Sequence, residues 1–328
     1  MPEKNPSGVN RVAIIGLGGM GRAMLSEMVF HPRFEVTAVF DPDARACTAA
    51  SEVHPSLEFA DAAEHLIRRD DVDLVYVASP PRSHGAYVTA ICDARKSVFC
   101  EKPLGVDVEA SRALAAYVEA SGVANAVNFS HAASVDAARA EAALRDGILG
   151  NVARVDMRLH LPAWPRDFQK TAEWLRYRNQ GGFTREVISH WVFLSQRLFG
   201  PGRVRFAHTH FPEDDRLAED RLVAALDFSG VPTLVSAAVG GRGPVGMEYT
   251  LWGSLRSLRL TSGGGMLECD DGEWRACFME ENSAPSDRQR SLDNLAGLLD
   301  GAPNTVADIK DALAVQEVIE AILEGRSG

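Results

Sequence analysis

The chain has 328 residues, of which 46% are hydrophobic and 24% charged, and its formal net charge at pH 7 is -11. This length is more than one domain usually needs, and the composition is that of a folded globular protein rather than a disordered one. A negative net charge without a basic stripe disfavours nucleic acids and anionic membrane surfaces as partners. We therefore expect two compact domains.

Neither the first residues nor the cysteines indicate export or metal binding. No apolar run approaches the roughly 20 residues that span a bilayer, and residues 1–10 lack the apolar core of a secretion signal. The five cysteines include no Cys-x-x-Cys pair, so they favour neither a disulfide framework nor a zinc site. These features predict a cytoplasmic protein without a metal.

The first part of the chain alternates short β-branched runs with helical patterns, which is typical of βαβ units and a parallel sheet. We expect strands at 12–15, 36–40, 74–78, 97–100 and, at the sheet edge, 125–128. We expect helices at 19–30, 44–53, 60–69, 84–94 and 109–120. The predicted fold of residues 1–125 is an α/β Rossmann domain, which is built on a doubly wound parallel sheet.

After residue 125 the pattern changes. A helix at 135–146 is followed by an alternating strand at 153–160, and further strands are expected at 204–209, 222–228, 233–239, 248–252 and 257–261. A strong helix at 183–198 interrupts these strands, and a last helix covers 306–323. We predict that residues 126–305 form an α+β domain with a large, mostly antiparallel sheet, and that the helix at 306–325 packs back near the first domain.

Residues 16–21, with the sequence Gly-Leu-Gly-Gly-Met-Gly, follow the first strand and begin a helix. In a dinucleotide-binding turn the first glycine permits a tight bend, the second lets the backbone approach a pyrophosphate, and the third allows close packing of helix and strand. A glycine-rich turn without a ligand is the alternative, but its place after an apolar strand favours the dinucleotide. The residues assigned to the cofactor are Gly16, Gly18, Gly19, Met20 and Gly21.

Asp41 follows the second strand, 20 residues after Gly21. A carboxylate there can accept hydrogen bonds from the adenosine ribose and repel a 2'-phosphate, which favours NAD. The alternative is that residues 41–43, Asp-Pro-Asp, only cap the next helix. Arg45 is one turn further and can accept a phosphate, so NADP is not excluded.

Two turns follow later strands, and ligands of open parallel sheets bind beyond the carboxyl ends of the strands. We therefore expect both turns, Ser-Pro-Pro at 79–81 and Glu-Lys-Pro at 101–103, to face the cofactor. Asn128 ends the last strand and can reach the nicotinamide ribose. The residues assigned to the cofactor here are Ser79, Pro80, His84, Glu101, Lys102 and Asn128.

Together these motifs resemble the glucose-fructose oxidoreductase and inositol dehydrogenase family, also written Gfo/Idh/MocA. Gly181-Gly182, followed by a helix with His190, is similar to the family's second-domain motif, so the resemblance covers nearly the whole chain. It implies an NAD(P)-dependent oxidoreductase that transfers hydride between the nicotinamide and a secondary alcohol or ketone of a sugar, cyclitol or related polar molecule. It also implies a substrate-binding second domain that pairs subunits into a homodimer or homotetramer through its sheet.

The resemblance places Lys102 beside the nicotinamide and the reacting carbon, where an ammonium can stabilise negative charge on the substrate oxygen. Glu186 and His190 are four residues apart and share a helix face. An imidazole there can take or return the proton of an alcohol. Lys102, His190 and Glu186 are thus the expected catalytic residues.

The second-domain motif departs from the family pattern, because Glu186 replaces an aspartate and Phe193 replaces a second one. Glu186 can therefore orient His190, contact the substrate, or pair with Arg185 or Arg197, and His190 can be a hydrogen-bonded core histidine. The departure keeps open a cofactor-binding regulator without turnover. The resemblance keeps open two further functions, an NAD-using glycosidase and an imine reductase of the same family.

A cluster of tryptophans and arginines precedes Gly181, at 163–166 and 174–178. Aromatic faces stack on sugar rings and arginine forks bind carboxylate or phosphate, which suggests a polar and even anionic substrate. Ordinary packing with a charged rim is the alternative. The residues assigned to the substrate are His131, Trp164, Trp174 and Arg176.

Overall fold

The computed structural model describes residues 8–261, 265–277 and 286–325. Its contacts divide the chain into two compact units. The first comprises Met1–Ala133 and Pro285–Leu313, and the second comprises Ser134–Ala284 and Ala314–Gly328. Among the described residues, no helix is both long and apolar enough to cross a membrane.

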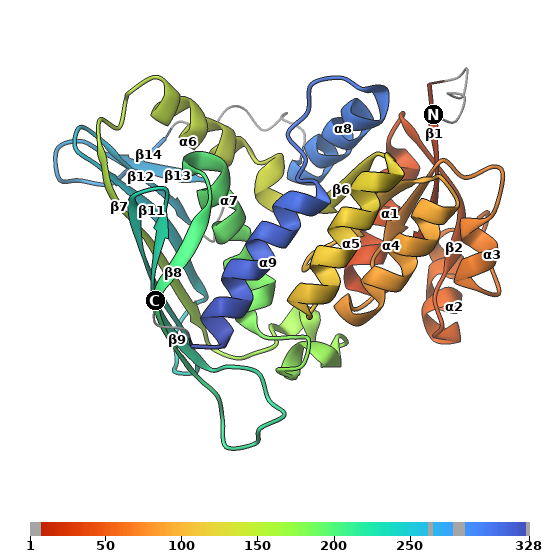
Figure 1. Cartoon of the computed structure of the whole chain (residues 1–328), viewed down its shortest axis with the longest axis horizontal. Coiled ribbons are helices and arrows are strands. Elements are labelled where there is room, and N and C mark those ends of the chain that lie inside the picture. The colour runs from red at the N-terminus through yellow and green to blue at the C-terminus, as the bar shows by residue number, and fades with distance from the viewer. Residues whose placement is uncertain (1–7, 262–264, 278–285, 326–328) are drawn as a thin grey trace. The chain divides into compact units, whose positions relative to one another are not determined.

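The first unit contains a sheet of six parallel strands in the order β3-β2-β1-β4-β5-β6 (Figure 1). The strands are β1 (Asn10–Ile15), β2 (Phe34–Phe40), β3 (Glu58–Phe59), β4 (Leu74–Val77), β5 (Ser97–Glu101) and β6 (Asn125–Asn128). This is the strand order of the doubly wound dinucleotide-binding fold, whose crevice lies where the order reverses, between β1 and β4. The predicted Rossmann sheet is confirmed.

Helices cover both faces of this sheet, which is why successive residues are all buried in β4 and from Val12 to Ile15 in β1. The helices are α1 (Gly19–Phe30), α2 (Ala44–Val53), α3 (Ala63–Ile67), α4 (His84–Asp93), α5 (Val108–Ser121) and α8 (Asp287–Asp300). Helix α4 packs on α5, and α1 packs on α8. Leu292 and Leu295 of α8 are fully buried in the same core cluster as Met24 of α1. The sequence analysis did not predict α8.

The second unit contains an eight-stranded sheet in the order β14-β13-β12-β11-β7-β10-β9-β8. Its strands are β7 (Val152–Leu161), β8 (Gly202–His210), β9 (Arg221–Phe228), β10 (Val231–Val239), β11 (Gly246–Gly253), β12 (Ser257–Thr261), β13 (Met266–Cys269) and β14 (Arg275–Ala276). Strands β7 and β10 pair in parallel and the other neighbours are antiparallel. The predicted, mostly antiparallel sheet is confirmed.

One face of this sheet is covered by helices. Helix α7 (Ser189–Phe199) packs on β8 and β9, and α6 (Val135–Arg145) packs on α7. The burial of β9 alternates accordingly: Leu222 and Ala224 are buried, whereas Arg221 and Val223 are exposed. Alternation of this kind is typical of a sheet with one covered face.

The extents of the units differ from those predicted at 125 and 305. Ala307 forms a bridge with Val127 of β6, and the backbone N-H of Ile309 donates to Asn125 Oδ1 at 2.9 Å, so 285–313 completes the first unit. Helix α9 (Ile309–Leu323) begins there, but its residues from Ala314 onward belong to the second unit. The boundaries differ from the prediction because residues near Ala307 pair with the edge strand β6, which is distant from them in sequence.

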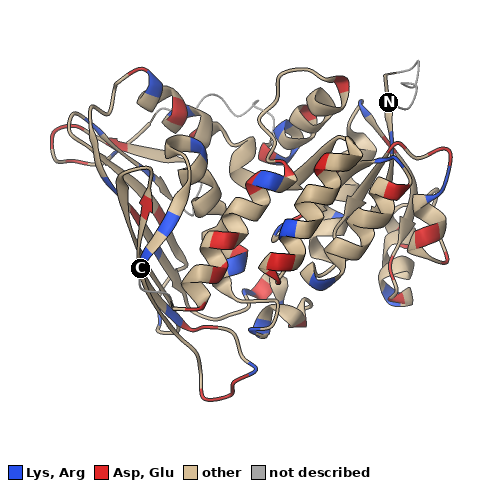
Figure 2. Ribbon diagram, viewed as in Figure 1, with Lys and Arg blue, Asp and Glu red and all other residues tan. Residues whose placement is uncertain are grey.

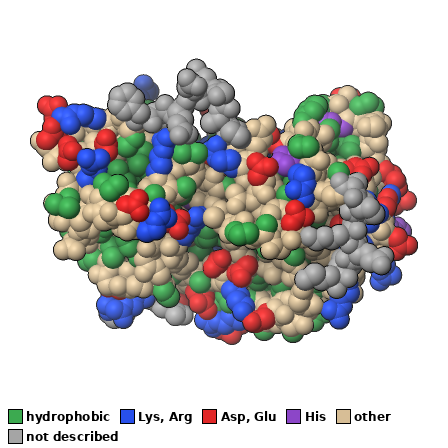
Figure 3. All heavy atoms as spheres, turned by 90° about the horizontal axis from the view of Figure 1, so that it is seen from above, with side chains coloured by type: hydrophobic (Ala, Val, Ile, Leu, Met, Phe, Trp, Pro, Cys, Tyr) green, Lys and Arg blue, Asp and Glu red, His purple; other side chains and the backbone are tan. Residues whose placement is uncertain are grey.

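Acidic and basic side chains are mixed on the helices of each unit (Figure 2). On the face drawn in Figure 3 they are interspersed with apolar side chains rather than gathered by sign. Many pair locally: Arg11 contacts Asp73 and Arg69 contacts Asp71, each at 2.7 Å. Such exposed pairs contribute little stability individually.

Candidate functional site

The glycine-rich turn after β1 is tightly packed at two of its glycines. The N-H of Gly16 donates to Phe40 O at 2.8 Å, and its φ of +101° disfavours any side chain. A Cβ at Gly21 would lie 1.9 Å from Gly16 O. Both positions therefore require glycine for the fold itself.

The other glycines of the turn are open. A Cβ added at Gly18 or Gly19 would meet no atom within 4 Å, and Gly18, Gly19 and Met20 are exposed. Gly18 is the N-cap of α1 and supplies no side-chain cap. The first-turn N-H groups of the helix are thus available to an anion, and the space above Gly18 fits the close approach of a diphosphate.

Asp41 contacts this turn directly. Its Oδ2 accepts a hydrogen bond from the N-H of Leu17 at 2.6 Å, and its Oδ1 accepts one from the N-H of Asp43 at 2.8 Å. The helix-capping role that was the alternative for residues 41–43 belongs to Asp43, whose side chain accepts from the N-H of Arg45. Asp41 instead ties the end of β2 to the glycine turn.

His84 joins the turns after β4 and β5. The ring is fully buried, with Nε2 2.7 Å from Ser79 O and Nδ1 2.9 Å from Pro103 O. Burial nevertheless lowers the pKa of His84, while the two carbonyl oxygens oppose that shift. His84 therefore fixes the turns at 79–81 and 101–103 relative to each other.

Glu101 is held by its neighbours on the adjacent strands. Its Oε1 accepts hydrogen bonds from Tyr76 Oη at 2.5 Å and from Asn128 Nδ2 at 2.7 Å. Burial and the Glu101 carboxylate raise the pKa of Tyr76 well above its usual value. Asn128, expected at the nicotinamide ribose, thus has its amide on Glu101, and the three side chains brace the strand end that precedes Lys102.

The structure therefore gathers the predicted cofactor residues at the carboxyl edge of one sheet. Hydrogen bonds connect neighbouring strand ends: Gly16 to Phe40, and Ala78 to Ile15 at 2.7 Å. Pro80 is exposed, whereas Lys102, directly after β5, has only 8% of its surface exposed. Burial to this extent is unusual for a lysine unless its ammonium is paired.

His131 lies in a short 3-10 turn, Ser130–Ala132, just after β6. Burial lowers its pKa to about 4, although the charge of Asp287 opposes the shift. The imidazole is therefore neutral near pH 7. It can donate or accept hydrogen bonds, but it carries no positive charge that would attract an anion.

This pKa predicts a pH dependence of stability. In the folded chain His131 remains uncharged down to about pH 4, whereas in the unfolded chain it takes up a proton near its ordinary pKa of 6.5. The unfolded state thus binds more protons between these values, and the free energy of unfolding decreases as the pH falls from 6.5 toward 4. Urea unfolding of His131→Gln should show a shallower decrease than the wild type. The exposed His65→Gln is the control, and an unchanged slope in His131→Gln would contradict the assignment.

In the second unit the predicted helix at 183–198 begins with a π-helical turn, Thr184–Ile188, before α7. The N-H of Ser189 donates to Thr184 O, while Ser189 Oγ donates to Arg185 O at 2.6 Å. The hydroxyl thus takes the carbonyl that the N-H would use in an α-helix. Such turns occur frequently at functional sites.

Glu186 and His190 stand out within this segment. From Gly181 to Ser195 all residues are buried except these two, which are partly exposed. Arg185 and Arg197, the alternative partners of Glu186, form ion pairs with Glu320 and with Glu141 respectively. Partial exposure also speaks against His190 as a fully enclosed core histidine.

The Glu186 carboxylate has partners that the sequence analysis missed. Gln169 Nε2 donates to Glu186 Oε1 at 2.8 Å, and Arg166 Nη2 lies 3.7 Å from the same oxygen. Arg166 Nε donates in turn to Gln169 Oε1 at 2.8 Å. The Arg166–Gln169–Glu186 network connects the segment after β7 to the π-helical turn.

A buried carboxylate supports the start of that turn. Glu219 Oε1 accepts a hydrogen bond from the N-H of Thr184 at 2.7 Å, and a Cβ at Gly182, whose φ is +101°, would lie 2.3 Å from Glu219 Oε2. Burial raises the pKa of Glu219. The Gly-Gly pair is therefore explained by close packing against Glu219 and the backbone of residues 174–175.

The tryptophans assigned to the substrate have structural contacts. Trp164 Nε1 donates to Leu175 O at 2.9 Å, and its ring meets buried Phe183 edge-on at 6.3 Å. The backbone carbonyl of Trp174 lies against Gly181. Arg176 is exposed, and its backbone carbonyl accepts from Ala218. The side chain of Trp164 thus has structural partners, whereas the contacts of Trp174 and Arg176 are made by their backbone.

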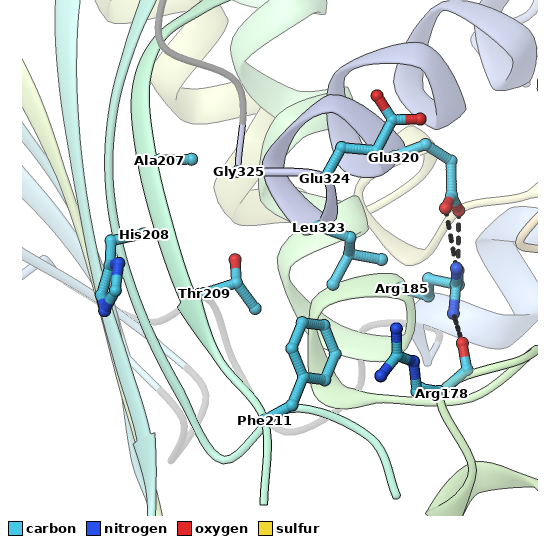
Figure 4. Close-up of a pocket in the computed structure, with 10 residues that line it drawn as sticks. All are labelled: Arg178, Arg185, Ala207, His208, Thr209, Phe211, Glu320, Leu323, Glu324 and Gly325. Carbon is cyan, nitrogen blue, oxygen red and sulfur yellow. Dashed lines mark hydrogen bonds and ion pairs between the residues drawn. The ribbon is translucent and has the colours of Figure 1, made fainter. Parts of the chain in front are cut away.

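A pocket of about 570 Å³ lies elsewhere in the second unit, between β8 and the end of α9 (Figure 4). The Arg185–Glu320 ion pair, with two 2.7 Å contacts, forms one side. The guanidinium of Arg178 lies 4.8 Å from the ring centre of Phe211. None of the predicted site residues lines this pocket.

Residues 10–129 match the family model described as "Oxidoreductase family, NAD-binding Rossmann fold". D-glucoside 3-dehydrogenase of Escherichia coli is 22% identical over 96% of this chain and 94% of its own length. Inositol 2-dehydrogenase of Rubrobacter xylanophilus is 35% identical, but over only 31% of this chain and 29% of its own length. An oxidoreductase of Agrobacterium radiobacter, solved with NAD+, L-tartaric acid and magnesium, superposes with a TM-score of 0.82 at 17% identity, covering 96% of this chain and 95% of that one.

The fold and the matched residues define an oxidoreductase with an NAD-binding Rossmann domain. Residues 10–129 match the Gfo/Idh/MocA family model, as the motifs of the first unit predicted.

Proposed function

We propose that this protein transfers hydride between NAD(P) and a secondary alcohol or ketone of a sugar, cyclitol or related polar molecule. The observation that carries the proposal is the open turn at Gly18 and Gly19, set at the carboxyl edge of a Rossmann sheet whose other strand ends are joined by hydrogen bonds. The names of the relatives, dehydrogenases of a glucoside and of inositol, support the substrate class.

The bound nicotinamide would supply the hydride acceptor or donor. Around it, the first unit would hold the dinucleotide through the glycine turn and Asp41, and the second would hold the substrate. The Lys102 ammonium would hydrogen-bond the reacting oxygen and stabilise its developing charge. His190 would hold the proton that leaves the hydroxyl. Glu186, which is held by Gln169, would orient His190 or contact the substrate.

The test is steady-state absorbance of the reduced nicotinamide with a panel of sugars, cyclitols and their ketones, beside calorimetry with NAD and NADP. Binding together with substrate-dependent turnover is expected. Binding without turnover on the whole panel would favour the regulator. Cleavage of a chromogenic glycoside without net change in NADH would favour an NAD-using glycosidase. Turnover of cyclic imines would favour an imine reductase.

Cofactor preference should depend on Asp41. Replacing it by Asn keeps a carbonyl oxygen for the N-H of Leu17 but removes the charge that would repel a 2'-phosphate. We expect the ratio of NADP to NAD dissociation constants, measured by calorimetry, to fall about fivefold, since one screened charge contact is worth roughly 1 kcal/mol. Wild-type protein that binds both cofactors equally would contradict this interpretation.

We also propose that the protein is a cytoplasmic homodimer or homotetramer paired through the uncovered face of the second-unit sheet. Phe206, Val223 and Leu234 on β8, β9 and β10 are 48%, 54% and 51% exposed. Phe206 and Leu234 are both paired with Ala225, so they flank one position of the sheet. Contiguous exposed apolar residues of this kind mark interaction surfaces. Sedimentation equilibrium tests the proposal, and a monomer at micromolar concentration would overturn it.

A further inference from the structure

The guanidinium of Arg166 is largely buried but incompletely bonded. Its side chain is 19% exposed, and burial lowers its pKa. The Nε atom donates to Gln169, while Nη2 is 3.7 Å from Glu186 Oε1, beyond hydrogen-bonding distance. Within the part of the chain that the structure describes, neither Nη1 nor Nη2 has a hydrogen-bond acceptor. Neither nitrogen is among the buried polar atoms that lack a partner, so both are accessible to solvent and open to a ligand.

The position of the guanidinium is fixed. Buried Gln169 accepts from Arg166 through Oε1 and donates to Glu186 through Nε2, so both ends of its amide are engaged. The ring of Phe168 lies against the guanidinium, with its centre 4.7 Å from Cζ. The planar guanidinium of Arg166 is thus held at Nε and along one face, so Nη1 and Nη2 point in a defined direction. Two guanidinium nitrogens in this arrangement can bind a carboxylate or a phosphate bidentately.

Simple neutralisation of Glu186 does not explain this geometry. An arginine that serves to pair with a carboxylate donates to it at about 2.7–2.9 Å. Here the neutral amide of Gln169 makes the 2.8 Å contact to Glu186, and Arg166 remains 3.7 Å away. The ion pair is loose, and the η nitrogens remain available to a second anion.

We propose that Arg166 binds an anionic oxygen group of the substrate, a carboxylate or a phosphate ester, through Nη1 and Nη2. The inference rests on the proposed function, because Arg166 contacts Glu186, which precedes His190 by four residues. It narrows the substrate class to acidic sugars or sugar phosphates. Arg166 would then determine specificity, with Gln169 as a positioning residue.

The experiment uses D-glucose, D-glucuronate and D-glucose 6-phosphate, which differ only in the group at C6. Calorimetry measures their binding to the wild type saturated with NADH, where no oxidation occurs. The wild type should bind one charged sugar at least about tenfold more tightly than glucose, since hydrogen bonds to charged groups contribute about 1.5–3 kcal/mol. Which charged sugar binds distinguishes carboxylate from phosphate.

Arg166→Gln should lose this preference, and Arg166→Lys should retain part of it. The exposed Arg145→Gln, on α6, is the control for charge alone and should retain the wild-type preference. Equal weakening of glucose and the charged sugars by Arg166→Gln would show that Arg166 only supports Glu186, and would overturn the proposal. So would failure of both charged sugars to bind more tightly than glucose to the NADH complex. Failure of NADH itself to bind would instead overturn the proposed function.

Discussion

Lys102→Ala should reduce turnover by about 100- to 1000-fold or more while leaving the dissociation constant of NAD within about threefold of the wild type. The reason is that a donor aimed at developing charge stabilises the transition state far more than the ground state, and loss of one such donor typically has this effect. Lys102 is 8% exposed and follows the braced residue Glu101 directly. Stopped-flow hydride transfer and calorimetry on the same protein separate the two quantities.

The matched control is Lys310→Ala. Lys310 is 58% exposed and pairs with Glu119, so neither turnover nor NAD binding should change. A Lys102→Ala protein that turns over at near wild-type rate would remove Lys102 from the mechanism. Equal loss of turnover and of NAD affinity would reassign it to cofactor binding.

Substitutions in the glycine turn should separate folding from ligand binding. In Gly21→Ala the new methyl group would lie 1.9 Å from Gly16 O, so the turn must shift. We expect a loss of about 2–4 kcal/mol in the free energy of unfolding. In Gly18→Ala no atom lies within 4 Å of the methyl group and φ is -63°, so stability should change by no more than about 0.5 kcal/mol.

NAD binding should show the complementary result. The methyl group of Gly18→Ala occupies the space through which a diphosphate approaches the backbone, and we expect affinity to fall by at least about tenfold. Thermal unfolding with and without NAD measures both effects in each protein. If Gly18→Ala binds NAD as tightly as the wild type does, the turn does not hold the diphosphate as proposed.

The first unit could be predicted well because its signals are local. The helices α1 and α2 begin and end where the spacing of apolar residues indicates, and each strand end carries its motif within a few residues. Because the six strands are parallel, their carboxyl ends lie at the same edge of the sheet, and this holds without knowledge of the side-chain packing. Helix α8 was missed although Ser286 and Gln289 form a capping box and Gly301 ends the helix in a left-handed conformation, so this signal was readable.

The second unit illustrates what sequence patterns do not contain. The partners of Glu186 come from 20 and 17 residues earlier, through a segment without regular periodicity. The support of the π-helical turn by Glu219 spans 35 residues. Such contacts depend on tertiary packing, and a cluster of arginines and tryptophans indicates only that a polar surface is near. The π-helical turn, in which Ser189 Oγ donates to Arg185 O, is likewise not visible in the spacing of apolar residues, which indicates only a helix.

The late position of α8 in the chain affects how the protein emerges during synthesis. When residues 1–133 have left the ribosome, the six strands are complete, but Leu292 and Leu295 are not yet made. The face of α1 that they will cover, including Met24, stays bare until the intervening unit has been translated. A nascent chain in that condition displays a hydrophobic surface that chaperones recognise, and a gene truncated after residue 133 should yield an aggregating product rather than an autonomous nucleotide-binding module.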